Sequence, residues 1–407
     1  MTLQTLIFLV LWGVELMLAV WGLRIAQFFS YRMPKVAARP VPDWSPQVAV
    51  ILPIKGVESG TGANLEAILN QAYRNYRVIA TVESLDDPVC NVIREFQEKL
   101  PSGKLDLVVA GRATERGQKV QNALRAIAAT TDKDEVLAFV DGDANLGPQC
   151  LQALVGPLGY GSHIGATTGY RFYIPVNSHP ANAIVSISNA IVASLFGPYR
   201  RTMAWGGSMA IRRADFYGYG VDAAWNHALS DDFTLSWCVR KKVGVKIHFV
   251  PQCLVASAAD FNFSRLFEFM TRQFRITRIS SWHLWASATA GSALYLLTLF
   301  SALYFAVIGF CLHQWGGAMG SSAVLIVLYV LSILRGRMLL RGGRRLLPNH
   351  AAELDRVRWW YVLGFPLVQA WILLTLIAAG VGRRMTWRGI RYRMVSPLET
   401  EVLNSRQ

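Results

Sequence analysis

Two aspartates one residue apart, Asp141 and Asp143, directly follow the apolar run 136–140. Because such a run is typical of a buried strand, both carboxylates can point into one crevice at its carboxyl end. Oxygen ligands in this arrangement hold Mg²⁺ or Mn²⁺ against a diphosphate. On its own, the Asp-Gly-Asp sequence is better explained as a polar turn after a strand, so its interpretation depends on the other acidic residues.

Two further acidic clusters stand at comparable places. Glu83 and Asp87 follow the strand-like run 78–82, where a carboxylate could bind a base or a ribose. Asp231 and Asp232 open a helical run. Each cluster alone is equally well explained as a helix N-cap. Together, the three clusters match the needs of glycosyl transfer with inversion, which are a metal-held diphosphate, donor recognition and a carboxylate base.

The elements that would position these clusters alternate in type. Apolar runs typical of buried strands alternate with segments whose apolar residues have helical spacing. This alternation predicts an α/β domain over about residues 47–262, with a mainly parallel sheet covered by helices. Ligands of such sheets bind at the carboxyl ends of the strands. The predicted strands are 48–52, 78–82, 105–110 and 136–140, and the predicted helices are 64–72, 88–99 and 117–129.

Apolar segments on both sides of this domain predict a membrane protein, in a chain of 407 residues that is 53% hydrophobic. Residues 3–23 can cross a bilayer and lack the leader and cleavage site of a signal peptide, so we expect a retained anchor over 1–24. C-terminal membrane segments are expected over residues 284–382. Gly364 and Pro366 could make the last of them bent or re-entrant. The apolar stretches are 284–312, 317–334 and 359–382.

The formal charge of +15 lies mainly beside these apolar segments. That placement favours an anionic membrane surface over nucleic acid, which we do not expect as a partner. Basic residues in the linker 25–46 put the α/β domain in the cytosol by the positive-inside rule. Residues 263–283 mix arginine with Phe and Ile at amphipathic spacing, which predicts a helix in the membrane interface. A basic tail follows over residues 383–407.

This ordered set of motifs resembles the ceramide glucosyltransferase branch, family 21, of the family 2 type inverting glycosyltransferases, whose fold is of the GT-A type. The resemblance covers residues 48 to about 278, and the set is far more specific than any single motif. The motifs are Leu52-Pro53-Ile54-Lys55-Gly56-Val57, Asn64-Leu65-Glu66, Asp86-Asp87-Pro88, Asp141-Gly142-Asp143 and Asp231-Asp232-Phe233.

Carried over to this sequence, the resemblance implies roles for individual carboxylates. Asp87 would help to bind the nucleotide, and Asp141 and Asp143 would serve the metal and the sugar phosphates. Asp232 would be the general base, with Asp231 as its rival. The implied cofactor is a divalent cation, Mn²⁺ or Mg²⁺.

Three other segments also resemble the family. Lys119 matches a lysine of the equivalent helix and could offset phosphate charge on the donor, or it is a solvated helix lysine. Trp205 and Gly207 resemble the glycine-containing acceptor loop, although a structural turn with a packed tryptophan explains them equally well. Residues 386–389 and Tyr392 resemble the branch's C-terminal Trp-Arg-Gly segment, which favours a tail near the site.

The family's (Q/R)XXRW motif would fall on Arg272, Gln273 and Arg275, but Ile276 stands where tryptophan is usual. That tryptophan normally lines the acceptor side, so the departure leaves the acceptor's identity and the register of the motif open. The three polar residues can still meet a phosphate or a headgroup. Alternatively, the arginines are snorkelling side chains in the membrane interface.

The resemblance implies a hexosyltransferase that moves glucose from UDP-glucose to a ceramide-like lipid. We expect a multi-pass protein of a bacterial plasma membrane with its catalytic domain in the cytosol. Another UDP-sugar, or a hopanoid, diacylglycerol or polyprenyl acceptor, would keep the same chemistry. A polysaccharide synthase would normally need more membrane spans, and a catalytically silent membrane scaffold is the alternative from another class.

Overall fold

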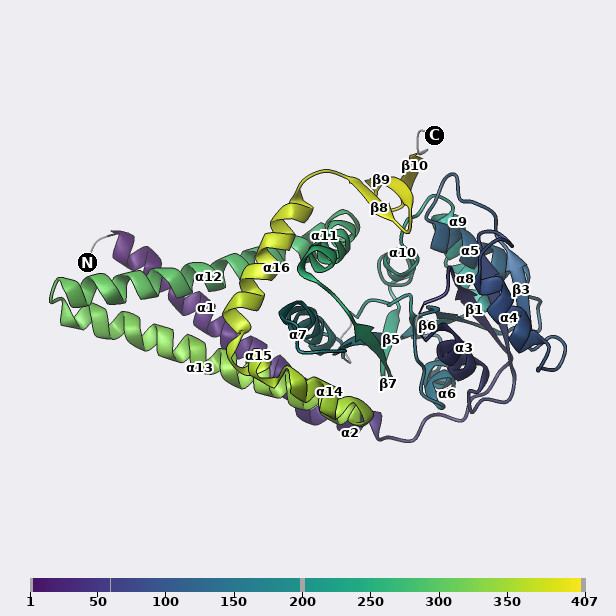
Figure 1. Cartoon of the computed structure of the whole chain (residues 1–407), viewed down its shortest axis with the longest axis horizontal. Coiled ribbons are helices and arrows are strands. Elements are labelled where there is room, and N and C mark those ends of the chain that lie inside the picture. Colours follow the sequence, from purple (N-terminus) through teal and green to yellow (C-terminus); the bar gives the residue numbers. More distant parts are fainter. Residues whose placement is uncertain (1–2, 59, 198–201, 404–407) are drawn as a thin grey trace. The chain divides into compact units, whose positions relative to one another are not determined.

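The computed structural model describes residues 3–58, 60–197 and 202–403. Within them, seven strands form one mixed sheet in the order β3-β2-β1-β4-β6-β5-β7 (Figure 1). The pairs among β1 to β4 are parallel, whereas β6 is antiparallel to β4 and β5. The predicted α/β class with a mainly parallel sheet is confirmed. The strands are β1 Val48–Pro53, β2 Tyr76–Val82, β3 Leu105–Val109, β4 Val136–Val140, β5 Ile164–Pro175, β6 Ser208–Arg212 and β7 Lys246–Ala259.

Helices bury both faces of the parallel strands. Along β1, Val50 and Leu52 belong to a core shared with α3, α4 and α6, whereas Ala49 and Ile51 belong to a core shared with α5, α8, α9 and α10. The alternation follows from the two-residue period of a strand, and burial on both faces explains the continuous apolar runs in the sequence. These helices are α3 Thr61–Leu69, α4 Val89–Gln97, α5 Gln118–Ala128, α6 Cys150–Val155, α8 Arg213–Gly218, α9 Val221–Trp225 and α10 Asp231–Trp237.

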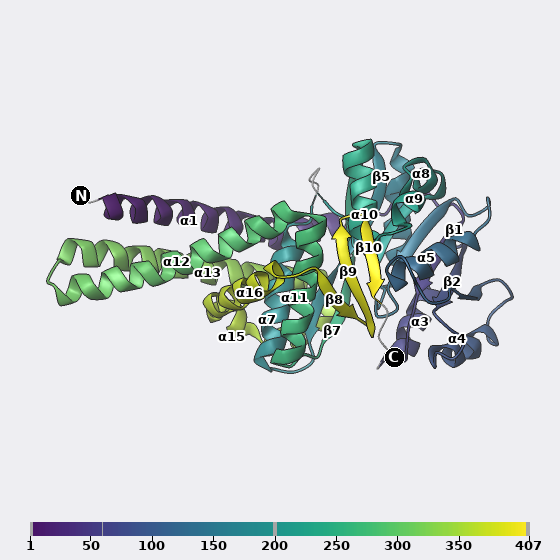
Figure 2. The same ribbon diagram turned by 90° about the horizontal axis from the view of Figure 1, so that it is seen from above.

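Three helices of the described residues are long and apolar enough to cross a membrane, at Thr5–Ala37, Trp282–Cys311 and Trp315–Leu346. The first comprises α1 (Leu3–Gln27) and, after a π-helical turn, α2 (Met33–Ala37). The other two are α12 and α13. Helices α1, α12 and α13 lie side by side (Figures 1 and 2). Their lengths and compositions fit the membrane segments that the sequence predicts.

The arginines from Arg335 to Arg345 lie on α13, although the apolar run in the sequence ends at residue 334. Leucine and arginine are both good helix formers. Leu339 and Leu340 are buried, so one face of the helix continues to pack beyond the apolar run. The helix therefore extends to Leu346.

The last apolar segment is divided at Gly364, as the glycine and proline there predict. Helix α15 (Arg358–Leu363) ends just before this glycine, and α16 (Phe365–Gly380) begins after it with Pro366 in its first turn. Proline suits this position because the first turn of a helix leaves its N–H groups without helical partners. Helix α16 has 16 residues, whereas a full span needs about 20.

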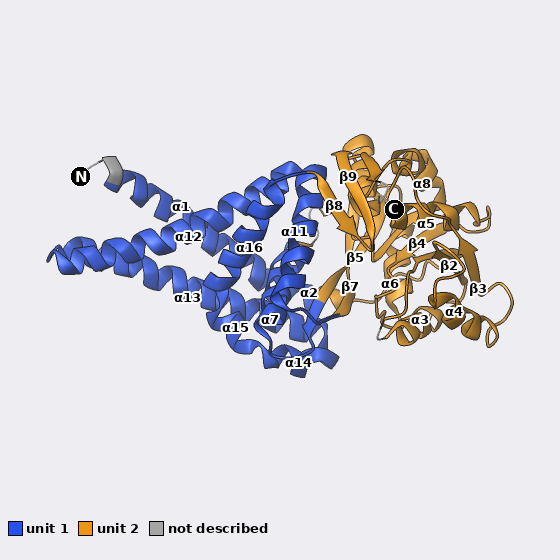
Figure 3. Cartoon of the chain, turned by 45° about the horizontal axis from the view of Figure 1, so that its top comes forward, with its two compact units in different colours: residues 1–35, 173–195, 258–382 blue, residues 36–172, 196–257, 383–407 orange. Residues whose placement is uncertain are grey.

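The described chain divides into two compact units (Figure 3). The helical unit comprises residues 1–35, 173–195 and 258–382, and it includes the long apolar helices together with α7 (Pro180–Ser194), α11 (Phe263–Ser280) and α14 (Ala351–Arg356). The catalytic unit, as we call the other one, comprises residues 36–172, 196–257 and 383–407. Residues 173–195 lie within the predicted α/β domain in sequence but group with the apolar helices.

The described residues of the predicted basic tail form a three-stranded antiparallel sheet in the catalytic unit, with strands β8 Arg384–Trp387, β9 Ile390–Ser396 and β10 Glu399–Leu403. Arg388 and Gly389 connect β8 to β9, with φ angles of 46° and 82°. Two consecutive residues in the left-handed region form the tight turn whose twist matches a β-hairpin. Along β9, buried Tyr392 and Met394 alternate with exposed arginines.

Candidate active site

Asp141 and Asp143 follow β4 directly, at the carboxyl end of a central strand. The Asp141 N–H donates to the carbonyl of Gly207 (3.3 Å), and the Asp141 carbonyl accepts from the N–H of Ala144 (3.0 Å). These backbone bonds hold the turn in place. The carboxylates are therefore not needed to form the turn, and they can interact with other charged groups.

A half-buried lysine neutralises part of this cluster. The Nζ atom of Lys119, in the first turn of α5, lies 2.6 Å from Asp141 Oδ1 and 2.9 Å from Asp231 Oδ2. Burial disfavours the lysine's charge, but Asp141, Asp231 and Asp232 outweigh burial and raise the Lys119 pKa. Burial also opposes ionisation of Asp141, yet Lys119 and Arg171 hold the Asp141 pKa below its usual value. Lys119 is therefore a half-buried counter-ion to two carboxylates, and not a solvated helix lysine.

The two aspartates that open α10 differ in environment, and Asp231 is the buried one, at 5% exposure. Burial raises the pKa of Asp231 to about 6, while Lys119 opposes the shift and Asp232 and Asp141 add to it. The Asp231 carboxylate is thus held inside a cluster of charges.

Asp232 is half-buried. Its carboxylate accepts hydrogen bonds from the N–H groups of Gly206 (3.3 Å) and Phe233 (2.7 Å) and contacts the hydroxyl of Ser230. The N-cap position belongs to Ser230, whose hydroxyl accepts from the Phe233 N–H at 3.2 Å. The capping explanation for Asp231 is therefore unnecessary, because the serine already fills that role.

Arg171, on β5, was missed by the sequence analysis. Its Nη2 atom lies 3.0 and 3.2 Å from the two carboxylate oxygens of Asp143 and 3.5 Å from Asp141 Oδ2. Its guanidinium also lies 5.2 Å from the centre of the Trp205 ring. The available signal was a lone charge within the otherwise uncharged run 164–175.

Glu83 and Asp87 lie after β2, the strand next to β1. Glu83 pairs with Lys55 at 2.7 Å. Asp87 accepts from the N–H of Gly56 through both oxygens (3.0 and 3.1 Å) and from the N–H of Val89 at the start of α4 (3.0 Å). Asp87 therefore has the predicted capping role and also ties the loop after β1 to the loop after β2.

The C-terminal sheet contacts two of these elements. Arg388, in its first turn, donates to the carbonyl of Lys55 (2.9 Å) and to the carboxylate of Glu58 (3.1 Å), both in the loop after β1. At the start of α5, the N–H of Gln118 donates to the hydroxyl of Tyr392 at 3.2 Å. The C-terminal segment therefore lies near the candidate site, as its resemblance to the family favours.

Trp205 and Gly207 lie in the loop before β6. The Trp205 N–H donates to Thr168 Oγ1 at 2.9 Å, which anchors the loop to β5. A side chain at position 207 would overlap the Trp205 ring and come within 2.7 Å of Asp141 Oδ2. Glycine is therefore required at this position by close approach, and Trp205 lies beside the acidic cluster.

Arg272, Gln273 and Arg275 lie on α11, in the helical unit. Arg275 Nη2 donates to the carbonyl of Ala378 on α16 (3.3 Å), and the Arg272 guanidinium lies 5.7 Å from the centre of the Phe269 ring. The backbone carbonyl of Gln273 accepts a hydrogen bond from the hydroxyl of Thr277, one turn later, at 2.9 Å. Ile276, in place of the usual tryptophan, is buried.

Asp141 and Asp143 suit a divalent cation whose remaining ligands come from a substrate and water. No group of three or more His, Cys, Asp or Glu residues able to hold a metal occurs among the described residues. The chain therefore offers a pair of carboxylates and not a complete cage. Mg²⁺-type sites commonly combine one or two carboxylates with substrate phosphates and water, and the 40% exposed side chain of Asp143 leaves access for such ligands.

The α/β fold, with acidic clusters at the carboxyl ends of its parallel strands, defines a protein with a candidate ligand site at that edge of the sheet. A model of glycosyl transferase family 21 matches residues 14–397, so the chain belongs to this family. The family resemblance seen in the sequence is confirmed.

Solved structures similar to this chain include mannosyltransferase PcManGT from Pyrobaculum calidifontis in complex with GDP-Man and Mn²⁺. The two sequences are 16% identical, the match covers 91% of this chain and 97% of the other, and the TM-score is 0.46. Glucosyl-3-phosphoglycerate synthase from Mycobacterium tuberculosis matches with 17% identity, coverage of 60% and 88%, and a TM-score of 0.39.

Proposed function

We propose that this chain is a membrane-bound inverting glycosyltransferase that transfers glucose from UDP-glucose to the hydroxyl group of a ceramide-like lipid. The observation that carries the proposal is the convergence of Asp141 and Asp231 on Lys119, with Asp143 and Asp232 beside them in the sequence, in a chain of glycosyl transferase family 21. Sugar transfer from a nucleotide needs a stabilised leaving group and a base, and this cluster offers groups for both.

The donor would bind along the loops that follow β1, β2 and β4. Asp87 and Glu83 would hold the nucleoside, since both lie after β2 and contact the loop after β1. Asp141 and Asp143 would hold a divalent cation, which supplies positive charge to the leaving diphosphate when bound. Lys119 would add a fixed positive charge beside the same carboxylate pair.

Asp232 is the better base of the two candidates. Asp231 is 5% exposed, and its carboxylate pairs with Lys119. An acceptor hydroxyl would therefore have to displace that lysine to reach the carboxylate. Asp232 is half-buried, and the backbone N–H groups that it accepts from fix its orientation without neutralising it. It would take the proton from the acceptor hydroxyl as the oxygen attacks the anomeric carbon opposite the leaving diphosphate, which inverts the configuration.

A lipid acceptor is supported by the three helices that are long and apolar enough to cross a membrane. Arg272, Gln273 and Arg275, with Trp205 and Gly207, are the groups we assign to the acceptor or diphosphate side. The positive-inside rule supports a catalytic unit on the cytosolic side of the membrane, which we propose to be a bacterial plasma membrane. The alternative acceptors are a hopanoid, a diacylglycerol or a polyprenyl lipid, with UDP-glucose or another UDP-sugar.

The experiment is to incubate the purified full-length protein with labelled UDP-sugars, Mn²⁺ and a panel of these lipids, and to detect glycolipid and released UDP. We expect a glucosylated ceramide-like product that disappears when the metal is chelated. A product on another lipid would replace the acceptor assignment and keep the chemistry. Binding of UDP with no turnover for any pair would instead support a silent membrane scaffold.

A further inference from the structure

The candidate metal site contains a positive charge on a residue that has no assigned role, Arg171. It lies on β5 and contacts both carboxylates of the Asp-Gly-Asp turn, at 3.0 and 3.2 Å for Asp143 and 3.5 Å for Asp141. We propose that Arg171 couples metal binding to donor binding: it holds the two aspartates until the donor binds, and then transfers to the donor's diphosphate. The inference rests on the proposed function, because it requires Asp141 and Asp143 to be the metal ligands.

Arg171 and a divalent cation would compete for the same oxygens. A metal of the Mg²⁺ type binds carboxylate oxygens at about 2.0–2.1 Å, and a guanidinium placed on those oxygens occupies the same directions of approach. The metal ion and the Arg171 guanidinium would also repel each other if both lay beside the same carboxylates. A metal that arrives without a nucleotide must therefore separate Arg171 from Asp143, which weakens metal binding.

Lys119 is not the group that exchanges. Its ammonium contacts two carboxylates from different elements, Asp141 at 2.6 Å and Asp231 at 2.9 Å, so loss of one leaves the other. Asp143, which Arg171 contacts at 3.0 and 3.2 Å, has a 40% exposed side chain. Exchange of a partner at an exposed carboxylate requires less desolvation than exchange at a buried one.

The donor diphosphate provides the second partner that Arg171 needs. A guanidinium binds phosphate oxygens through two parallel hydrogen bonds, so leaving Asp143 for a diphosphate does not strand the charge. The ring of Trp205, 5.2 Å from the guanidinium, already lies beside the side chain and can hold it by a cation–π contact. Because coupling between ligands is reciprocal, UDP should tighten metal binding by the same factor as the metal tightens UDP binding.

The test measures Mn²⁺ affinity of the full-length protein by electron paramagnetic resonance, with and without UDP, so that no turnover is needed. In the wild-type protein we expect weak Mn²⁺ binding that UDP strengthens. In Arg171→Gln, which removes the competing charge, we expect the nucleotide-free affinity for Mn²⁺ to rise about tenfold and the strengthening by UDP to shrink. The matched control is Arg213→Gln, which removes an arginine that pairs with the exposed Asp132 at 2.8 Å.

Several results would overturn the inference. An unchanged or lower nucleotide-free affinity in Arg171→Gln would mean that Arg171 does not compete with the metal. Absence of Mn²⁺ binding in every protein, even with UDP, would overturn the proposed metal site as well. If Arg171→Gln does not fold, Arg171→Lys tests the same point, because a lysine retains the charge without the planar fork of a guanidinium. If UDP strengthens Mn²⁺ binding in Arg171→Lys as much as in the wild type, the guanidinium does not have the proposed role.

Discussion

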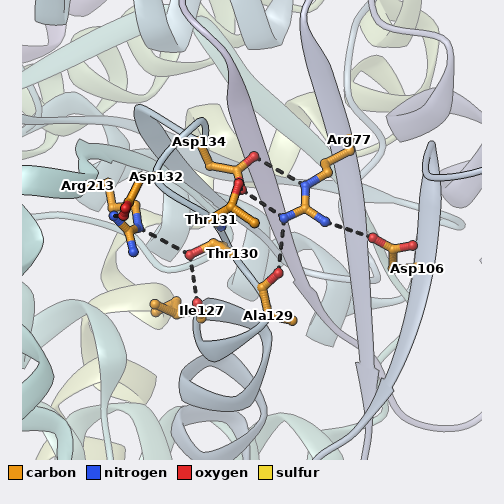
Figure 4. A network of polar contacts seen from close by, with 9 residues as sticks. All are labelled: Arg77, Asp106, Ile127, Ala129, Thr130, Thr131, Asp132, Asp134 and Arg213. Atoms are coloured by element: carbon orange, nitrogen blue, oxygen red, sulfur yellow. Dashed lines mark hydrogen bonds and ion pairs between the residues drawn. The ribbon is translucent and has the colours of Figure 1, made fainter.

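The two ends of the parallel strands both hold buried charge, but they use it differently. At the amino ends, Arg77 on β2 contacts Asp134 (2.8 Å), Asp106 (2.9 Å) and the carbonyl of Ala129 (3.0 Å), as Figure 4 shows. Asp134 also accepts from the N–H of Thr131 at 2.8 Å. Most of the hydrogen-bonding groups of Arg77 and Asp134 therefore have protein partners, which the β-strands and their loops hold in place.

At the carboxyl ends, the carboxylates have cationic partners that a ligand could exchange. Asp143 is 40% exposed, and its closest partner, Arg171, contacts it from a different strand. A metal can take the place of Arg171 beside Asp143, and a phosphate can take the place of Asp143 beside Arg171, whereas Asp134, at 1% exposure, has no comparable access. Buried charge therefore indicates function only where the partners can be replaced, and this comparison is open to test.

The largest effect is expected at the carboxyl ends, from Asp232→Asn. An amide cannot take a proton from the acceptor, so turnover should fall by about 10²–10⁴-fold, the usual range for a general base. The melting temperature and the affinity for UDP should stay close to the wild-type values, since the amide oxygen can still accept from Phe233 and only the longer bond from Gly206, 3.3 Å, is lost. Steady-state kinetics and UDP titration measure these quantities.

The control is Asp231→Asn. This change should weaken the cluster around Lys119 without removing the base, so some turnover should remain. If Asp231→Asn abolishes turnover and Asp232→Asn does not, Asp231 is the base and the assignment made from exposure is wrong.

At the amino ends, Arg77→Met should act on stability instead. It leaves Asp134, which is 1% exposed, without its cationic partner, and breaking a buried pair in this way typically destabilises by about 3–5 kcal/mol. We expect a lower melting temperature of the catalytic unit by calorimetry in detergent. The UDP affinity of the protein that remains folded should not change, and a selective loss of UDP affinity at an unchanged melting temperature would remove the distinction between the two ends.

Acid should disturb the amino ends in a defined pH range. Burial opposes ionisation of Asp134, but the hydrogen bonds from Arg77 and Thr131 outweigh it and hold the Asp134 pKa below its usual value. The folded state therefore binds this proton less readily than the unfolded chain, and the pair stabilises the fold fully above the unfolded pKa. That contribution is lost as the pH falls through the lower folded pKa.

Unfolding of the wild type and of Asp134→Asn as a function of pH measures this effect. The stability difference between them should be constant near neutral pH and shrink below about pH 4, where the Asp134 carboxyl of the unfolded wild-type chain begins to take up a proton. A difference that grows toward acid pH would contradict the sign of the shift.

Local patterns were sufficient to predict the elements that position the site. The strand before Asp141 was predicted with the same bounds, Val136–Val140, because its residues are all apolar and buried on both faces. The approach of Lys119 to Asp141 follows from a parallel sheet, since the segments after β3 and β4 begin at the same edge.

Contacts between distant segments were not predictable in the same way. Arg171 has no motif around it, and its partnership with Asp143 depends on an antiparallel arrangement of β5 and β6 that no local period encodes. The C-terminal sheet was predicted only as a basic tail because its arginines dominate the composition. Its alternation of Tyr392 and Met394 with arginines was the signal that a strand was present.

The smallest effect is expected from Arg213→Gln, at the amino ends beside the Arg77 network (Figure 4). Arg213 pairs with Asp132 at 2.8 Å, but the Asp132 side chain is 99% exposed, so water can solvate both charges when the pair is broken. We expect no measurable change in melting temperature, and none in turnover or UDP affinity. A loss comparable to that of Arg77→Met would mean that the whole group of charges acts as one network, and that exposure does not separate its structural members from its surface pairs.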